Sequence, residues 1–368
     1  MARVSRPRNG AGDPVRLEAS ADATTRGGSG LGGGGGGGAA IGRRGVCLGL
    51  AAGLMAAPAV RAAPLGGAYL DVNGDRQWLM VAGSGPPLLI LHGGPGASET
   101  VLFRHFNRAL EHRFTVAYWD QRGAGRSYDP ERPPPNMTVA QLVRDLDVVV
   151  GLLRERLGAP VLLLGHSWGS ALGLLYARER PDAVAGFIGV GQVADQGAQE
   201  RASWAWALSE ARRRGHGRAV RALEGIGAPP LDVPALMVKN RWVGAFDGDF
   251  APGFSKTRTL LSALIGGETG VGEVRRLIAA NTFSLRALWP EVRTLDLPAR
   301  VPGVDVPVAF LLGRLDRQCP SDLAAAYLGR LGAPSRRLVW FERSAHNPPF
   351  EEPEAFDAAV LGTVHVWG

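Results

Sequence analysis

The chain has 368 residues, 45% of them hydrophobic, which is enough to bury a sizeable core in one large domain or in one domain with an insertion. Its formal net charge is +7, but eight Arg and three Asp or Glu stand in the first 63 residues and supply five of these charges. The remainder carries only +2, so the net charge does not imply a basic binding surface, and no nucleic-acid partner is expected.

The first 44 residues are polar, contain several Arg and include a seven-glycine tract at 32–38. Such a segment offers too little apolar surface for a core. Residues 1–44 are therefore predicted to be a disordered, low-complexity extension.

Residues 45–63 are predicted to be a signal-peptide core and cleavage region: an apolar run at 45–60 follows Arg43 and Arg44, and the end of the segment offers small residues suited to cleavage. The run has the length of a signal-peptide core and is too short for a stable membrane span. The paired arginines favour a twin-arginine signal, which would make the mature protein periplasmic or secreted. A misassigned start codon, with the true start near Met55 or later, would instead give a cytoplasmic protein.

From about residue 64, strand-like apolar runs alternate with amphipathic segments, which is typical of a mostly parallel sheet covered by helices on both faces. A helix is predicted to begin at Val139, because Thr138 and Gln141 form a capping box before residues of helical apolar spacing. The predicted strands of this first part of the core, residues 64–191, are 77–83, 87–92, 114–120, 161–165 and 183–191.

The apolar run 162–174 is interrupted by the sequence GHSWG at 165–169. A strand that ends at Leu164, turns sharply and continues as a helix explains this pattern, because the two glycines let backbone segments approach closely. Such a turn would expose the Ser167 hydroxyl at the top of the sheet, where it can act as a nucleophile.

The strand pattern stops between about residues 192 and 290 and then returns. The intervening segment is polar, helical and interrupted by glycine, and we predict that it is a helical cap inserted between two strands of one sheet. The second part of the core, residues 291–368, contains the predicted strand 306–313, a helix at 321–331, the strand 336–341 and a last helix after Pro353.

A serine nucleophile needs a base and an acid, and the second part of the core offers both. His346 stands on the loop after the last strand, and Asp316 follows the first strand after the cap. Asp305 precedes that strand and Asp322 lies in the next helix, so neither is well placed. The order Ser167, Asp316, His346 is that of the α/β-hydrolase fold.

Two backbone N–H groups are candidates for an oxyanion hole. One is that of Trp168, directly after the nucleophile. The other is that of Gly94 in HGGPG (92–96), which follows the strand 87–92, because Pro95 has no N–H to donate.

Cofactors are not expected. The chain has only Cys47 and Cys319, and export would remove Cys47, so a disulfide framework is excluded. Neither a zinc-ligand spacing nor a GxGxxG or Walker motif is present. The predicted partner is a small-molecule or short-peptide substrate, and the sequence leaves the oligomeric state open.

Five ordered motifs between about residues 68 and 357 together resemble the proline iminopeptidase-like branch of the α/β-hydrolases. The resemblance implies an α/β-hydrolase fold with a serine nucleophile, and it implies that Asp120 and Arg122 make buried structural contacts near the site. The motifs are HGGPG (92–96), WDQRGAGRS (119–127), GHSWGS (165–170), GRLD (313–316) and SAHNPPFEEPE (344–354).

This sequence departs from the proline iminopeptidase pattern at the residues that would bind the amine of the substrate. The resemblance implies cap glutamates that hold a free amine, one of them in a WxxWE stretch, but the nearest sequence here, KNRWVGAF, has Val243 after its tryptophan. Five other glutamates could supply the charge, although each is predicted to be a solvated helix-face residue. They are Glu200, Glu210, Glu224, Glu268 and Glu273.

The predicted function is a cofactor-independent serine hydrolase that cleaves small peptides, amides or esters through an acyl-enzyme. Ser167 would attack, His346 would transfer the proton, and Asp316 would orient the imidazole. The alternatives are a carboxylesterase or acyltransferase without a peptidase role, and a non-catalytic hydrolase-fold receptor. A dehalogenase or epoxide hydrolase would need an aspartate in place of Ser167 and is excluded.

Overall fold

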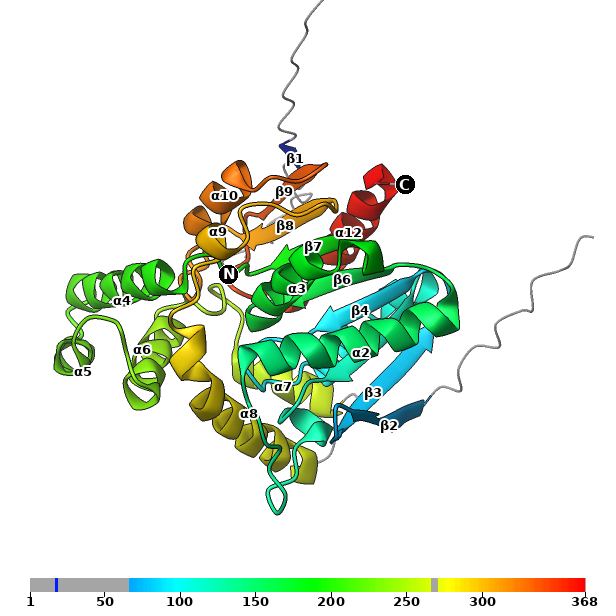
Figure 1. The fold of residues 1–368 in the computed structure, drawn as a ribbon. Coiled ribbons are helices and arrows are strands. Elements are labelled where there is room, and N and C mark those ends of the chain that lie inside the picture. The colour runs from blue at the N-terminus through cyan, green and yellow to red at the C-terminus, as the bar shows by residue number, and fades with distance from the viewer. Residues whose placement is uncertain (1–16, 19–65, 266–270, 368) are drawn as a thin grey trace, which may run out of the picture.

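A computed structural model describes residues 17–18, 66–265 and 271–367 (Figure 1). The predicted export segment 45–63 lies outside these described residues, as does the predicted extension 1–44 apart from residues 17 and 18. Leu17–Glu18 form a two-residue strand, β1, antiparallel to β9 (Arg336–Phe341). None of the helices in the described ranges is both long and apolar enough to cross a membrane.

A nine-stranded sheet lies at the centre, in the order β1-β9-β8-β7-β6-β4-β5-β3-β2. The strands β4 to β9 run parallel to one another, and β1, β2 and β3 are antiparallel additions at the two edges. This confirms the predicted mostly parallel sheet. The further strands are β2 (Gly66–Val72), β3 (Asp75–Gly83), β4 (Pro87–Leu91), β5 (Thr115–Asp120), β6 (Val161–His166), β7 (Val184–Val190) and β8 (Val308–Gly313).

Successive residues of the central strands face two separate apolar layers, as the pleat of a strand requires. On β4, Leu89 and Leu91 join one layer, whereas Leu88 and Ile90 join the other. Helices cover both faces of the sheet, as predicted (Figure 1). The first layer includes residues of α2 (Val139–Leu157), α3 (Trp168–Glu179) and α10 (Ser321–Arg330), and the second includes residues of α1 (Thr100–Phe106) and α12 (Pro353–Trp367).

Helix α2 begins at the predicted residue, but only half of the predicted capping box forms. The Thr138 hydroxyl accepts a hydrogen bond from the Gln141 N–H at 3.1 Å. The Gln141 side chain instead donates to Asp145 at 2.8 Å. The side-chain oxygen of Gln141, which a capping box would use to accept the Thr138 N–H, instead accepts a hydrogen bond from Arg144 at 2.6 Å.

In its described residues, the segment between β7 and β8 is built of helices joined by loops. Helices α4, α5 and α6 form a group at one side of the sheet, and α8 runs below the sheet in the view of Figure 1. These helices make up the predicted cap, whose boundaries at 192 and 290 stay a prediction. The helices are α4 (Gln196–Arg213), α5 (Gly217–Ile226), α6 (Val233–Ala245), α7 (Lys256–Ile265) and α8 (Val271–Val292), followed by the short α9 (Leu297–Arg300).

Candidate active site

Ser167 lies at the sharp turn between β6 and α3. Its backbone has φ 51° and ψ −119°, in a region that residues with a side chain rarely adopt. A Cβ on Gly165 would lie 2.4 Å from the carbonyl oxygen of Gly169, and a Cβ on Gly169 would lie 2.0 Å from a carbonyl oxygen of β4. Both glycines are therefore required for the close approach, although β6 continues to His166, further than predicted.

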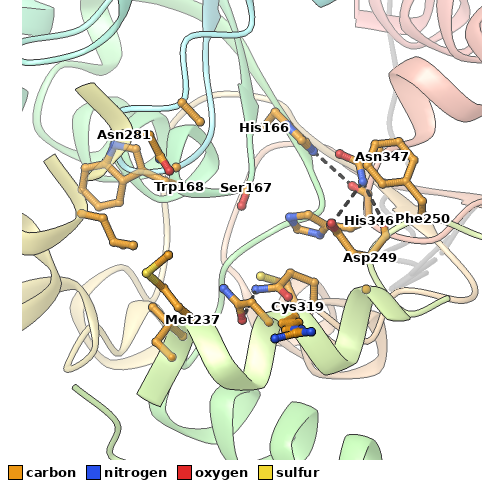
Figure 2. Close-up of a pocket in the computed structure, with 18 of the residues that line it drawn as sticks. His166, Ser167, Trp168, Met237, Asp249, Phe250, Asn281, Cys319, His346 and Asn347 are labelled. Atoms are coloured by element: carbon orange, nitrogen blue, oxygen red, sulfur yellow. Dashed lines mark hydrogen bonds between the residues drawn. The ribbon is translucent and has the colours of Figure 1, made fainter. Parts of the chain in front are cut away.

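The structure brings the other two predicted triad residues together with Ser167. Asp316 follows β8, His346 follows β9, and Oδ2 of Asp316 accepts the Nδ1–H of His346 at 2.8 Å. Ser167 and His346 border the same cavity, of about 640 Å³, and both side chains are turned towards it in Figure 2. Asp316 is fully buried, and its other oxygen accepts the N–H groups of Gln318 and Cys319, each at 2.8 Å.

The environment of His346 favours its charged form. Burial alone would lower the pKa of the imidazole, because it removes the imidazolium from water. The charge and hydrogen bond of Asp316 outweigh burial, Asp249 and Glu99 add to their effect, and the pKa of His346 rises to about 9. The ring is thus paired with a carboxylate that stabilises the imidazolium formed when it takes a proton.

The predicted oxyanion donors flank the same cavity. The Trp168 N–H belongs to the first residue of α3, where helical N–H groups lack an intrahelical partner and the helix dipole favours an anion. In the loop after β4, the Gly93 N–H already donates to Glu99 at 2.9 Å, and Pro95 has none. Gly94 is exposed and borders the cavity. This geometry supports the pair Gly94 and Trp168, whose role stays a prediction.

Gln121 connects two of these loops, and sequence reasoning did not single it out. Its side chain accepts the indole N–H of Trp168 at 3.0 Å and donates to the carbonyl oxygen of His92 at 3.1 Å. Its own N–H donates to the His92 ring at 3.1 Å. The motif WDQRGAGRS therefore supports both candidate oxyanion segments.

The neighbours of Gln121 in this motif make the buried contacts that the resemblance implied. Arg122 is buried and forms an ion pair with Asp145 at 2.6 Å. Asp120, also buried, accepts hydrogen bonds from the hydroxyls of Ser98 and Thr100. Both residues thus act on the framework of the site, as predicted.

Glu351 holds the backbone on both sides of His346. One carboxylate oxygen accepts the N–H groups of Ala345 at 2.9 Å and Asn347 at 3.1 Å. The other accepts the N–H of Ala251, from the segment between β7 and β8, at 2.6 Å. The place of Glu351 in the motif SAHNPPFEEPE was the only sequence signal for this role.

Glu200 is not the solvated residue that the sequence predicted. It is buried on the cavity wall, and its two carboxylate oxygens lie 2.9 and 2.8 Å from Nζ of the fully buried Lys239. The prediction was wrong because α4 packs this face against α6 rather than exposing it. Of the other glutamates, Glu210, Glu224 and Glu273 form ion pairs with arginines, and Glu268 lies outside the described residues.

Asp249 is a further carboxylate at the cavity. Its carbonyl oxygen accepts the N–H of His346 at 3.0 Å (Figure 2). Across the described ranges, the Asp249 side chain has no ion pair, and its one hydrogen bond comes from Asn347 at 3.4 Å. It is therefore available to a charged ligand in a way that Glu200 is not.

Known proteins resemble this chain in sequence and in fold. The family model described as alpha/beta hydrolase fold matches residues 86–215. The probable aminopeptidase YbaC of Bacillus subtilis is 32% identical over 294 residues, which cover 78% of this chain and 92% of that protein. The proline iminopeptidase of Heyndrickxia coagulans is 25% identical over 309 residues, covering 80% of this chain and 96% of that protein.

A solved structure, the proline iminopeptidase of Mycobacterium smegmatis, superposes with a TM-score of 0.61 at 20% sequence identity, over 82% of this chain and 98% of that one. This likeness shows the shared fold, and the identity to YbaC over nearly its whole length shows the family. The chain therefore belongs to the α/β-hydrolase enzymes, on their proline iminopeptidase-like branch.

Proposed function

We propose that the protein is a serine hydrolase that cleaves small peptide, amide or ester substrates through an acyl-enzyme at Ser167. The observation that carries this proposal is the buried Asp316–His346 pair, which opens into the same cavity as Ser167 at its strained turn. A cavity of about 640 Å³ has the size of a small-molecule site.

Each residue has a role in this mechanism. Ser167 attacks the carbonyl carbon, His346 takes its proton and returns it to the leaving group, and Asp316 keeps the imidazole oriented. The N–H groups of Gly94 and Trp168 stabilise the oxyanion that forms. Water then hydrolyses the acyl-enzyme, with His346 as the base again.

A turnover panel tests the proposal. It compares p-nitrophenyl esters of short acyl chains, aminoacyl p-nitroanilides and the same anilides with a blocked amine. Turnover of at least one class is expected, and a fluorophosphonate that modifies Ser167 should abolish it. An inert protein across the panel, or labelling at a different serine, would contradict the proposal.

Within this panel, we expect p-nitrophenyl esters of short acyl chains to be cleaved at least as well as proline p-nitroanilide. Both oxygens of Glu200 already bind Lys239, so this carboxylate does not offer a free partner to a substrate ammonium. Unless Asp249 pairs with it, an ammonium under the cap would cost several kcal/mol. The same observation favours the second candidate function, a carboxylesterase or acyltransferase without a peptidase role.

A preference of more than about a hundredfold for the free-amine substrate, roughly 2.7 kcal/mol, would contradict this expectation. Asp249 would then be the first residue to test, since its carboxylate borders the cavity without an ion pair in the described part of the chain. Asp249→Asn should raise KM for unblocked substrates only. The matched control is Asp247→Asn, because Asp247 borders the same cavity and lies 3.6 Å from Arg214.

The pH dependence of kcat/KM provides a separate check. Only neutral His346 can accept the Ser167 proton, and its pKa is about 9, so kcat/KM for an ester should rise with pH and level off above about 9. Initial rates at subsaturating ester, corrected for spontaneous hydrolysis, measure the profile. A plateau that begins near 6.5, the ordinary pKa of histidine, would show that Asp316 does not act on the base.

A further inference from the structure

His166, which precedes the proposed nucleophile, lies between two hydrogen-bond acceptors. Its Nδ1 is 2.8 Å from Oε1 of Glu99, and its Nε2 is 3.1 Å from the carbonyl oxygen of His346 (Figure 2). A neutral imidazole has one N–H, whereas these contacts need two donors, because neither a carboxylate nor a carbonyl can donate. His166 therefore carries both ring protons and forms a buried ion pair with Glu99.

Glu99 keeps the negative charge that this pair needs. Burial would raise the pKa of its carboxyl group. The charge and hydrogen bond of His166, with the hydrogen bond from the Gly93 N–H, outweigh burial and hold this pKa below its ordinary value.

His92, the residue after β4, is a second buried histidine near this site, and its contacts need only a neutral ring. Its Nδ1 is 2.9 Å from the carbonyl oxygen of Gly93, and its Nε2 is 3.1 Å from the N–H of Gln121. One neutral ring, protonated at Nδ1, satisfies both contacts. His92 therefore serves as an internal reference for the charged His166.

The ion pair connects three loops that carry the proposed chemistry. Glu99 accepts the Gly93 N–H of the oxyanion loop at 2.9 Å, and His166 adjoins Ser167 and binds the carbonyl oxygen of His346. We propose that Glu99 and His166 are positioning residues for the hydrolysis, and that the hydrogen bonds of this pair keep the oxyanion loop, the nucleophile turn and the base loop in place relative to one another. This inference rests on the proposed function.

Two substitutions separate the hydrogen bonds from the rest of the side chain. In Glu99→Gln, the amide oxygen can accept the Gly93 N–H, the amide N–H can donate to Nδ1 of His166, and a neutral His166 can still donate to His346. In Glu99→Leu, the leucine side chain is similar in size to glutamate, and both hydrogen bonds of the Glu99 carboxylate are lost. The first variant is therefore the conservative rescue of the second.

The expected result is a split between kcat and KM. With a p-nitrophenyl ester, Glu99→Leu should lower kcat by at least about tenfold and leave KM within about threefold, because the reacting groups are misplaced rather than the substrate lost. Glu99→Gln should keep kcat within about threefold of the wild-type value. If Glu99→Leu does not fold, Glu99→Asp, whose carboxylate is too short to span both partners, replaces it with the same expectation for kcat.

Nitrogen-15 NMR of the histidine-labelled full-length protein tests the charge without relying on rates. Near neutral pH, the rings of His346 and His166 should both be doubly protonated in the wild type, and Glu99→Gln should lose the second proton of His166 while His92 stays neutral throughout. A singly protonated His166 in the wild type, or a wild-type kcat in Glu99→Leu, would overturn the proposal. Fluorophosphonate labelling of the wild type at Ser167 reports separately on the proposed function.

Discussion

Replacing Ser167 with alanine should lower kcat/KM for the best substrate of the turnover panel by about 10⁵- to 10⁶-fold, because the residual rate would come only from substrate binding and the oxyanion donors. The turn itself should persist, since alanine keeps a Cβ in the backbone conformation that Ser167 already adopts at φ 51°. Steady-state rates measure the loss, and circular dichroism with thermal unfolding shows that the variant is folded.

The matched control is Ser255→Ala, because Ser255 borders the same cavity and also carries a hydroxyl. It should retain both turnover and fluorophosphonate labelling. Comparable losses in the two variants would contradict the assignment of Ser167 as the nucleophile.

Asp316→Asn should lower kcat by about 10⁴-fold, as the loss of the orienting carboxylate does in other triads. The amide oxygen can keep the N–H groups of Gln318 and Cys319, so the side chain stays in place. Its NH₂ group would then face Nδ1 of His346 and donate to it, which puts the ring proton on Nε2. In that tautomer, the ring cannot accept the Ser167 proton.

The same substitution also changes the titration of His346 in a defined direction. Asp316 raises the pKa of the imidazole, so its removal should lower this pKa and shift the remaining pH profile towards lower pH. Asp305→Asn, an exposed position before β8, should change neither the rate nor the profile. An equal loss of rate at both positions would show that Asp316 is not the acid.

The elements that the sequence predicted correctly are those with local causes. The strands β4, β5, β6 and β8 are short apolar runs, and the turn at Ser167 is marked by glycines that steric contact requires. The approach of Asp316 to His346 was predictable as well, because both follow neighbouring strands of a parallel sheet and the ends of such strands lie at one edge.

The features that sequence reasoning missed depend on which elements pack together. Glu200 reads as a polar residue of an amphipathic helix, and only the packing of α4 against α6 buries it beside Lys239. Glu99 stands in a short segment after the HGGPG motif. Its partner His166 is 67 positions away in the chain, so no local pattern indicates the contact between them. Helix α1 was not predicted either, because its seven residues are too few to show a helical period.

The hydrogen bonds of Glu351 to the backbone on both sides of His346 have a consequence for exchanging caps between relatives. Two of the supports of the base loop come from the segment between β7 and β8: the Ala251 N–H, which binds Glu351, and the Asp249 carbonyl oxygen, which binds the His346 N–H. A chimaera that joins a foreign cap to this core would therefore have to retain residues 249–251. A graft that moves this backbone would leave the His346 N–H and one Glu351 oxygen without these partners even if every triad residue were kept.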